Sequence, residues 1–347
     1  MRDNLPPYDS FLLVSFGGPE GPDDVMPYLE NVLRGKRVPR ERMLEVAQHY
    51  QSFGGVSPIN EQNRELMAAI LSEFRQHDVD LPVYWGNRNW KPYFAETLQQ
   101  MKDDGCRRAI AFFTSMFSCY SGCRQYRENI AEAQAQVGPD APIVEKVRMG
   151  FNHPHFIDTL ADSVRQAAKS LASDHVADTL MFTAHSIPNS MADNCDYVLQ
   201  LNETCRLVAE AAGFETWELV FQSRSGPPQQ PWLEPDVCDR IEQKHRESPI
   251  GGLVLMPVGF VSDHMEVLYD LDDEAATLCK KLGIPLARAA TPGTAPKFVQ
   301  MIRELVQERI ANSDQRAAVG KLGPWHDVCP QDCCLYTPAR RPASAGR

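Results

Sequence analysis

The sequence predicts an α/β protein of two three-layer domains, each with a mainly parallel sheet, that face each other across a cleft. Short apolar runs alternate with longer amphipathic runs along most of the chain, as they do where strands and helices alternate. The length of 347 residues corresponds to about two domains. A content of 43% hydrophobic and 23% charged residues is ordinary for globular proteins and argues against a fibrous or disordered chain.

The predicted strands are short apolar runs, and the predicted helices are the longer amphipathic runs between them. We expect strands over residues 11–16, 83–85, 108–113, 143–147, 179–183, 217–221 and 252–256. We expect helices over residues 61–76, 94–104, 124–136, 157–172, 189–212, 236–246 and 270–282. A last helix is predicted over 294–311, which opens with Thr and Pro and has apolar residues at helical spacing.

Turn-forming residues in VGPDAP and MGFNHP suggest a domain boundary within 137–152. We therefore expect a first domain over 1–150 and a second over 151–312, with the last helix packing back on the first domain. Periodicity ends near residue 313, so 313–347 is expected to be a cysteine-bearing tail. Its final residues, PARRPASAGR, are expected to be disordered.

Charge and cysteine content restrict the partners and the compartment. A net charge of -11 argues against nucleic acid as a partner, because nucleic-acid binders need clustered positive potential. The first residues lack a secretory signal and no window resembles a transmembrane segment, so we expect a cytoplasmic protein with reduced thiols. In a reducing compartment, those of the ten cysteines that are clustered in the sequence are expected to bind a metal or an iron–sulfur cluster rather than to form disulfides.

Polar and glycine-rich segments follow six of the predicted strands. Ligands of open parallel sheets bind beyond the carboxyl ends of the strands, so these segments predict a large binding cleft with aromatic, hydroxyl and imidazole groups. The first, SFGGPEG, lacks the spacing of a dinucleotide or phosphate loop, and nucleotide binding is poorly supported. The six segments are SFGGP (15–19), GNRNW (86–90), TSMFS (114–118), TAHSIP (183–188), QSRSGPP (222–228) and PVGFVSDH (257–264).

His185 and a run of acids are the candidate reactive groups at these ends. If a helix begins near residue 264, Glu266, Asp270 and Glu274 fall at i, i+4 and i+8 on one face. Taken alone, the three acids are typical of a solvated acidic helix face, and His185 is typical of a hydrogen-bonded structural histidine. Together, an imidazole that accepts protons near pH 7 and hard carboxylate oxygens suit a divalent cation in transit.

Three thiols within six residues, Cys329, Cys333 and Cys334, are hard to explain as packing in a segment without periodicity. A fourth is available from Cys123 or Cys119. Four thiolates suit zinc or an iron–sulfur cluster, and spacing does not choose between them. The simpler alternative is that they are free thiols on a flexible tail.

Several long motifs in order resemble those of the ferrochelatases: GGVSPINEQN, YWGNRNWKPY, TAHSIP, FQSRSGPPQQPWLEP and PVGFVSDHMEVLYDLDDE. The resemblance extends from about residue 11 to about residue 308. SFGGPEGPDDV and TSMFSCYSGCRQYREN are most similar to the actinobacterial-type branch that uses coproporphyrin III. The resemblance implies two Rossmann-like, chelatase-type domains around a central cleft. It also implies a lyase that inserts Fe²⁺ into coproporphyrin III to give coproheme in haem biosynthesis.

Two other functions stay open. A protoporphyrin IX ferrochelatase differs only in the ring substituents that the cleft accepts. A porphyrin or haem carrier on the same fold would bind the ring without reaction. The combination of His185 with an acidic row favours an enzyme, because a carrier needs no proton acceptor beside a cation path.

The resemblance assigns roles by residue. His185 and Glu266 are the catalytic pair and the ligands of substrate iron, facing each other across a pocket wide enough for a tetrapyrrole. His185 takes the pyrrole protons and Glu266 handles the metal, although the reverse assignment is nearly as defensible. Asp270 and Glu274 continue the metal path. The porphyrin-binding candidates are Ser57, Tyr126, Tyr50, Arg34 and Phe16, the last standing where some relatives have a Tyr able to ligate metal.

The resemblance also chooses between the metals of the tail, because some family members carry a [2Fe–2S] cluster on one internal and three C-terminal cysteines. The expected ligands here are Cys123, Cys329, Cys333 and Cys334, with Cys119 as the alternative internal ligand. The expected partners are a porphyrin and ferrous iron. A transient contact with a membrane or with another enzyme of haem synthesis is left open.

Overall fold

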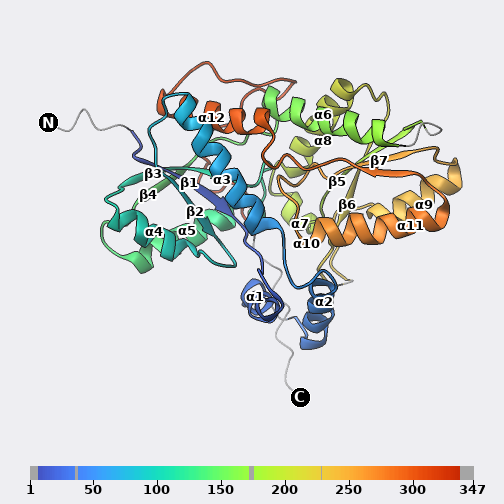
Figure 1. Cartoon of the computed structure of the whole chain (residues 1–347), viewed down its shortest axis with the longest axis horizontal. Helices are drawn as coiled ribbons and strands as arrows, with labels where there is room; N and C mark the ends of the chain where they lie inside the picture. Colours follow the sequence, from blue (N-terminus) through green and yellow to red (C-terminus); the bar gives the residue numbers. More distant parts are fainter. Residues whose placement is uncertain (1–6, 36–37, 172–175, 228, 337–347) are drawn as a thin grey trace.

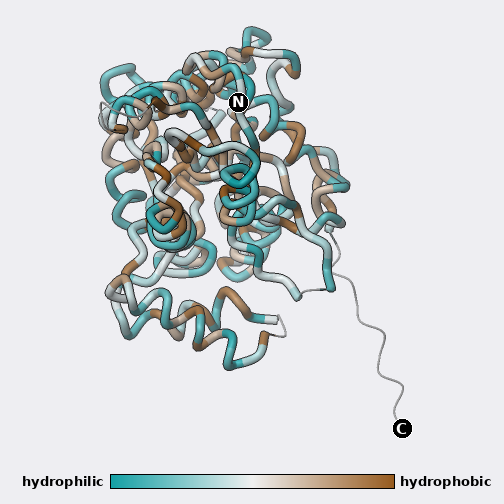
Figure 2. The backbone as a smooth tube through the Cα atoms, turned by 90° about the vertical axis from the view of Figure 1, so that its right-hand side faces the viewer, coloured by the Kyte–Doolittle hydropathy of each residue, from teal (hydrophilic) through white to brown (hydrophobic). Residues whose placement is uncertain are grey.

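The computed structural model describes residues 7–35, 38–171, 176–227 and 229–336 (Figure 1). The predicted disordered segment PARRPASAGR (338–347) lies outside the described residues. Figure 1 shows two sheets side by side, with α12 and α6 above them, α3 running diagonally beside the first sheet, and α1 and α2 below. In Figure 2 the outer helices are mostly hydrophilic and the hydrophobic segments lie between them.

The first sheet contains four parallel strands in the order β2-β1-β3-β4. Its strands are β1 (Ser10–Ser15), β2 (Val83–Asn87), β3 (Arg108–Phe113) and β4 (Ile143–Lys146). The helical segments up to residue 150 are η1 (Pro22–Asp24), α1 (Val25–Val32), α2 (Arg40–Ser52), α3 (Ile59–Gln76), α4 (Phe94–Asp103), the π-helix η2 (Tyr120–Arg124) and α5 (Gln125–Val137).

The second sheet repeats this order as β6-β5-β7-β8, again with parallel neighbours. We propose a boundary near residue 150, because each sheet takes its strands from one side of that position. The strands are β5 (Thr179–His185), β6 (Glu218–Gln222), β7 (Leu253–Met256) and β8 (Leu286–Arg288). The helices are α6 (Pro154–Ser170), α7 (Asn189–Ala192), α8 (Tyr197–Ala212), α9 (Val237–Glu247), α10 (Met265–Val267), the π-helix η3 (Leu268–Ala275), α11 (Ala276–Leu282) and α12 (Pro296–Ile310).

Each sheet is covered on both faces, which explains why its inner strands, β1 and β3 in the first sheet and β5 and β7 in the second, are mostly apolar and buried. In β1, Phe11 and Leu13 enter one core cluster while Leu12 and Val14 enter the cluster on the other face. This follows from the two-residue period of a strand. Covered parallel sheets leave their carboxyl edges as the place where polar loops converge.

The structure confirms the α/β class and all seven predicted strands, and it corrects four details. Strand β8 was missed because it has three residues, and α1 and α2 were missed within the long connection after β1. The predicted helix 189–212 is two helices, interrupted by the turn-forming residues Asp193–Asp196 between α7 and α8. The predicted helix 270–282 begins as the π-helix η3.

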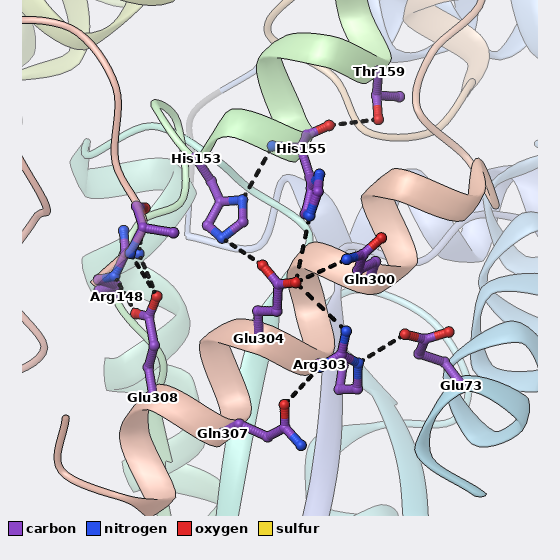
Figure 3. Close-up of polar contacts among 11 residues, drawn as sticks. Glu73, Arg148, His153, His155, Thr159, Gln300, Arg303, Glu304, Gln307 and Glu308 are labelled. Atoms are coloured by element: carbon purple, nitrogen blue, oxygen red, sulfur yellow. Dashed lines mark hydrogen bonds and ion pairs between the residues drawn. The ribbon is translucent and has the colours of Figure 1, made fainter. Parts of the chain in front are cut away.

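Helix α12 joins the two halves. Phe298 contacts Phe112 of β3 and Phe156 of α6, with ring centroids 6.0 and 6.1 Å apart. Figure 3 shows Glu304 of α12 between two imidazoles that precede and begin α6. Its carboxylate oxygens lie 3.3 Å from Nε2 of His153 and 3.4 Å from Nε2 of His155. Arg303 of α12 lies 2.8 Å from Glu73 of α3, so α12 makes polar contacts with helices of both halves.

Candidate active site

The candidate catalytic groups lie at the carboxyl edge of the second sheet. His185 is the last residue of β5 and pairs in register with Gln222, the last residue of β6. The Tyr197 hydroxyl donates to the His185 carbonyl oxygen at 3.1 Å. Since β5 is an inner strand with neighbours on both sides, the backbone that carries the imidazole is rigidly held.

The hydrogen bonding of His185 leaves one ring nitrogen for chemistry. Nδ1 contacts the carbonyl oxygen of Ser186, an acceptor, so Nδ1 carries the proton in the neutral ring. Nε2 is then the basic nitrogen, and it lies 3.7 Å from Oε2 of Glu266. Burial by itself would lower the pKa of His185, but the Glu266 charge and the Ser186 contact outweigh it and the pKa is raised.

Glu266 lies at the start of α10, where the ring of His264 caps the helix. Nδ1 of His264 accepts from the Glu266 amide at 3.2 Å, and Gln222 donates to the Glu266 carbonyl oxygen at 3.1 Å. The Glu266 side chain is 47% exposed, so its carboxylate is open to a ligand. The structure thus gives His264 a capping role and burial lowers its pKa.

The distance between the catalytic candidates corrects one expectation. A macrocycle between two side chains needs about 3.5 Å of contact distance on each of its faces, or roughly 7 Å in total. The 3.7 Å between His185 and Glu266 leaves no room for a ring between them. In this structure the two groups therefore lie side by side at one sheet edge, and not on opposite walls of a pocket as wide as a tetrapyrrole.

Two acids of the row, Asp270 and Glu274, lie on the π-helix η3, and Glu266 lies on α10 directly before it. A π-helix closes i→i+5 hydrogen bonds and has more residues per turn than an α-helix, so side chains four apart line up more closely. Burial, together with the charges of Glu266 and Glu274, raises the pKa of Asp270 to about 7. Ser223 and Gln222 donate to Oδ2 of Asp270, Gln222 at 3.2 Å, and partly offset this effect. Asp270 therefore exchanges a proton near neutral pH.

The porphyrin candidates lie in different surroundings. Ser57 packs against Gly18 so closely that a Cβ at Gly18 would lie 2.6 Å from its own Cβ. Tyr50 is buried against Tyr28, with ring centroids 5.7 Å apart, and its pKa is raised by burial and by the negative charge of Glu266. Arg34 is exposed on the surface.

The two remaining candidates, Phe16 and Tyr126, both contact Arg88, a cation that was not predicted from the sequence. Arg88 follows β2, and its guanidinium carbon lies 5.9 Å from the ring centroid of Phe16 and 5.7 Å from that of Tyr126. Burial lowers the pKa of Arg88. A cation held between aromatic rings at a strand end is a natural carboxylate partner. Its place in GNRNW, directly after an apolar run, was the available signal.

A second contact missed from the sequence links α2 to the acidic row. The rings of His49 and Tyr269 stack 4.0 Å apart at an angle of 9°. Tyr269 belongs to η3 and hydrogen-bonds Glu274. The helix that carries Tyr50 is therefore fastened to the helix that carries Asp270.

The predicted thiols of the tail gather around η2. The Cys123 thiol is hydrogen-bonded to Cys329, and the sulfurs of Cys333 and Cys334 are 3.5 Å apart. That hydrogen bond lowers the pKa of Cys329, and the charge of Lys146 acts in the same direction. The Arg124 guanidinium holds the tail by donating to the carbonyl oxygens of residues 331 and 333, both at 2.9 Å.

Cys119 occupies a different position from Cys123. Its sulfur accepts from the Gly122 amide at 3.1 Å and so caps η2. None of the ten cysteines forms a disulfide. Among the described residues, no helix has both the length and the apolar character that a membrane crossing requires.

Comparison with known proteins finds similar sequences over nearly the whole chain. A sequence model described as Ferrochelatase matches residues 8–310. The chain is 66% identical over 343 residues to a ferrochelatase of Rhodopirellula baltica, covering 99% of this chain and 98% of that one. It is 50% identical over 371 aligned positions to a coproporphyrin III ferrochelatase of Streptomyces griseus, covering 100% of this chain and 98% of that one.

A solved structure supports the fold independently. The cobalt complex of the sirohydrochlorin chelatase SirB from Bacillus subtilis subspecies spizizenii superimposes with a TM-score of 0.54. The match covers 90% of this chain and 99% of that chain, at 10% identity. The chelatase fold is thus present. From the family match over 8–310 and the 66% identity to a full-length relative, the chain belongs to the ferrochelatase family.

Proposed function

We propose that this chain is a lyase that inserts Fe²⁺ into coproporphyrin III, giving coproheme and two protons. The carrying observation is the His185 imidazole 3.7 Å from the Glu266 carboxylate, at the end of an acidic row. A proton acceptor and a hard ligand on one side of the ring are what metal insertion needs. The coproporphyrin III relatives, about 50% identical over the whole chain, support the choice of substrate.

The roles follow from the hydrogen bonds. Nε2 of His185 accepts a pyrrole proton because Nδ1 is committed to the Ser186 carbonyl oxygen. Glu266 holds the incoming iron, and its charge stabilises the imidazolium that forms. Asp270 and Glu274 pass iron to Glu266. Asp270 can bind iron only when its carboxyl is ionised, which happens as the pH rises through about 7. In the reverse assignment Glu266 takes the proton and His185 ligates iron.

The macrocycle is held by the side chains near β1 and β2. Phe16 offers an aromatic face, and Ser57, Tyr126, Tyr50 and Arg34 are the polar candidates from the sequence. Arg88 is added as a carboxylate partner because it lies between two of them. Coproporphyrin III has four carboxylates and protoporphyrin IX has two, so cations around the ring favour the former.

The tail thiols suit a [2Fe–2S] cluster. The donor set is soft and anionic, and Lys146 and Arg127 supply positive charge beside it. Cys123, Cys329, Cys333 and Cys334 are the cysteines we assign, the last two with sulfurs 3.5 Å apart. Cys123 is preferred to Cys119 because Cys329 acts on the Cys123 thiol, whereas the Cys119 sulfur caps η2. When bound, the cluster supplies a redox-active covalent link between η2 and the tail. We place the protein in the cytoplasm, where such thiols stay reduced.

The test is anaerobic incubation with ferrous iron and either porphyrin. We expect the free-base spectrum of coproporphyrin III to be lost with rapid turnover, and that of protoporphyrin IX to be lost slowly. Faster loss with protoporphyrin IX would favour the other ferrochelatase. Stoichiometric binding of both rings without spectral conversion would identify a carrier and overturn the proposal.

A further inference from the structure

Helix α3 begins against the loop that follows β1. The side chain of Asn60, 1% exposed, binds both backbone polar groups of Gly18: Oδ1 accepts from the amide at 3.2 Å, and Nδ2 donates to the carbonyl oxygen at 3.1 Å. Oδ1 of Asn60 also accepts from Nδ2 of Asn87, the last residue of β2, at 3.3 Å. A buried amide whose groups are paired holds its partners in one arrangement. The first turn of α3 therefore fixes the loop that carries Phe16.

Gln62, on the same turn, reaches the second half of the chain. Successive residues of an α-helix are about 100° apart around its axis, so Asn60 and Gln62 point to opposite sides of α3. Oε1 of Gln62 accepts from the backbone amide of Asp263 at 2.8 Å. Asp263 lies between β7 and α10, three residues before Glu266. One turn of α3 thus contacts both the loop after β1 and the loop before α10.

The loop before α10 is held at Asp263 from a second direction. The Asp263 carboxylate accepts from Nη1 and Nη2 of Arg288, on β8, at 3.2 and 3.1 Å, and from the Thr291 hydroxyl at 3.0 Å. Nε of Arg288 also donates to Asp272 of η3 at 2.6 Å. The side chain of Asp263 is thus attached to β8 and η3, whereas its amide is attached to α3. The two attachments meet three residues before Glu266.

We propose that Gln62 is a positioning residue for metal insertion. Its hydrogen bond to the Asp263 amide fixes the segment that leads to Glu266 relative to the loop that carries Phe16. The inference rests on the proposed function, which makes Glu266 a ligand of iron and Phe16 a contact of the ring. Small displacements of reacting groups cost large factors in rate, and a residue that orients another changes kcat more than KM. Loss of the Gln62 acceptor is therefore expected to slow the chemical step while porphyrin binding is kept.

The test compares three variants of the whole chain. Gln62→Met keeps the length of the side chain but removes the acceptor, and Gln62→Glu keeps an acceptor oxygen. Gln76→Met is the matched control, because Gln76 ends α3 and donates to Ser72 of the same helix.

Gln62→Met should lower kcat about tenfold and leave the KM for coproporphyrin III within about twofold, whereas Gln62→Glu and Gln76→Met should keep kcat within about threefold. Hydrogen exchange followed by mass spectrometry should show faster exchange of the Asp263 amide in Gln62→Met and unchanged exchange in the other two variants.

Two results would overturn the inference. An unchanged kcat in Gln62→Met, even with a lower unfolding temperature, would make the residue merely structural. An equal loss of kcat in Gln62→Glu would show that the acceptor is not what matters. If Gln62→Met does not fold, Gln62→Asn, which draws the acceptor back by a methylene group, should show the same loss of kcat, and full activity there would contradict the role.

Failure of the proposed function would look different. The unaltered protein would then metallate neither coproporphyrin III nor protoporphyrin IX. The exchange rate of the Asp263 amide would still decide whether Gln62 holds the loop before α10.

Discussion

The two π-helices of the described structure each carry groups suited to metal, but they are built in opposite ways. On η3 and the turn before it, hard carboxylates follow one another along a single segment and repel each other. At η2, one soft thiol meets ligands from a tail about two hundred residues further along the chain. A row of carboxylates on one segment suits a metal ion that passes along it. Thiol ligands from two distant segments suit a metal ion that is permanently bound.

The charges around the two sites point the same way. Burial and neighbouring acids raise the pKa of Asp270, so its ionised form is disfavoured until a cation or a higher pH compensates. Near the thiols, Lys146 and Arg127 stabilise the anionic form. The acidic row is therefore interpreted as a path for substrate iron, and the thiol site as the place of a resident metal.

The largest effect is expected for His185→Ala. Loss of the proton acceptor should reduce turnover about 10³-fold, with porphyrin binding kept because the ring contacts lie elsewhere. Steady-state rates and fluorescence titration with coproporphyrin III measure the two quantities. His77→Ala, on the surface, is the control. Turnover within about tenfold of the unaltered protein, ~1.4 kcal/mol in barrier, would remove His185 from the mechanism.

Glu266→Gln should come next, with turnover lower by about 100-fold, because the amide keeps the size but loses the charge beside His185. The iron and sulfide content of the tail should be unchanged. If both the turnover and the iron and sulfide content fell, the catalytic site and the tail centre would not be independent. That result would contradict the division of the metal sites into a path and a resident centre.

Asp270→Asn should act mainly on iron, raising its apparent KM about tenfold. In the unaltered protein, apparent iron affinity should fall as the pH drops below about 7, where Asp270 takes up its proton. The Asn variant should lose that dependence. Initial rates against iron concentration from pH 6 to 8 measure both effects, and an unchanged pH profile would contradict the role.

The same carboxyl predicts a stability effect. Folding raises its pKa from 3.8 to about 7, so the folded state binds more protons between these values. Stability contributed by this group therefore falls as the pH rises from about 4 to about 7. Asp270→Asn should unfold at a temperature roughly 2–4 °C higher than the unaltered protein at pH 8, with a smaller gain at pH 5.

The smallest effect on the chemical step is expected for Cys123→Ser. It should remove the visible absorbance of the tail centre, yet change the single-turnover rate of porphyrin-loaded protein less than about threefold, because Cys123 lies on η2 and the catalytic pair on β5 and α10. Cys119→Ser should keep the absorbance. The opposite result for the two serine variants would assign Cys119 as the ligand.

The hydrophobic periodicity of the sequence predicted the buried strands and the residues at their ends. It predicted few of the contacts between segments that are far apart in the chain. Strand β1 could be predicted because both of its faces are covered, which makes it a continuous apolar run. His185 could be placed at a strand end because β5, which it ends, is also such a run. The π geometry of η3 was not, since acids four apart also suit an α-helix. Distances between remote segments, such as His185 to Glu266 or Cys123 to Cys329, are set by packing that no local pattern encodes.

The most direct test of the division between the two sites follows labelled iron. Protein whose tail centre holds natural iron is given ⁵⁷Fe²⁺ and one equivalent of coproporphyrin III without oxygen, and the product and the protein are separated for Mössbauer spectroscopy. We predict ⁵⁷Fe in the metalloporphyrin and unlabelled iron in the protein. Labelled protein with unlabelled metalloporphyrin would contradict the account, because the tail would then be the donor.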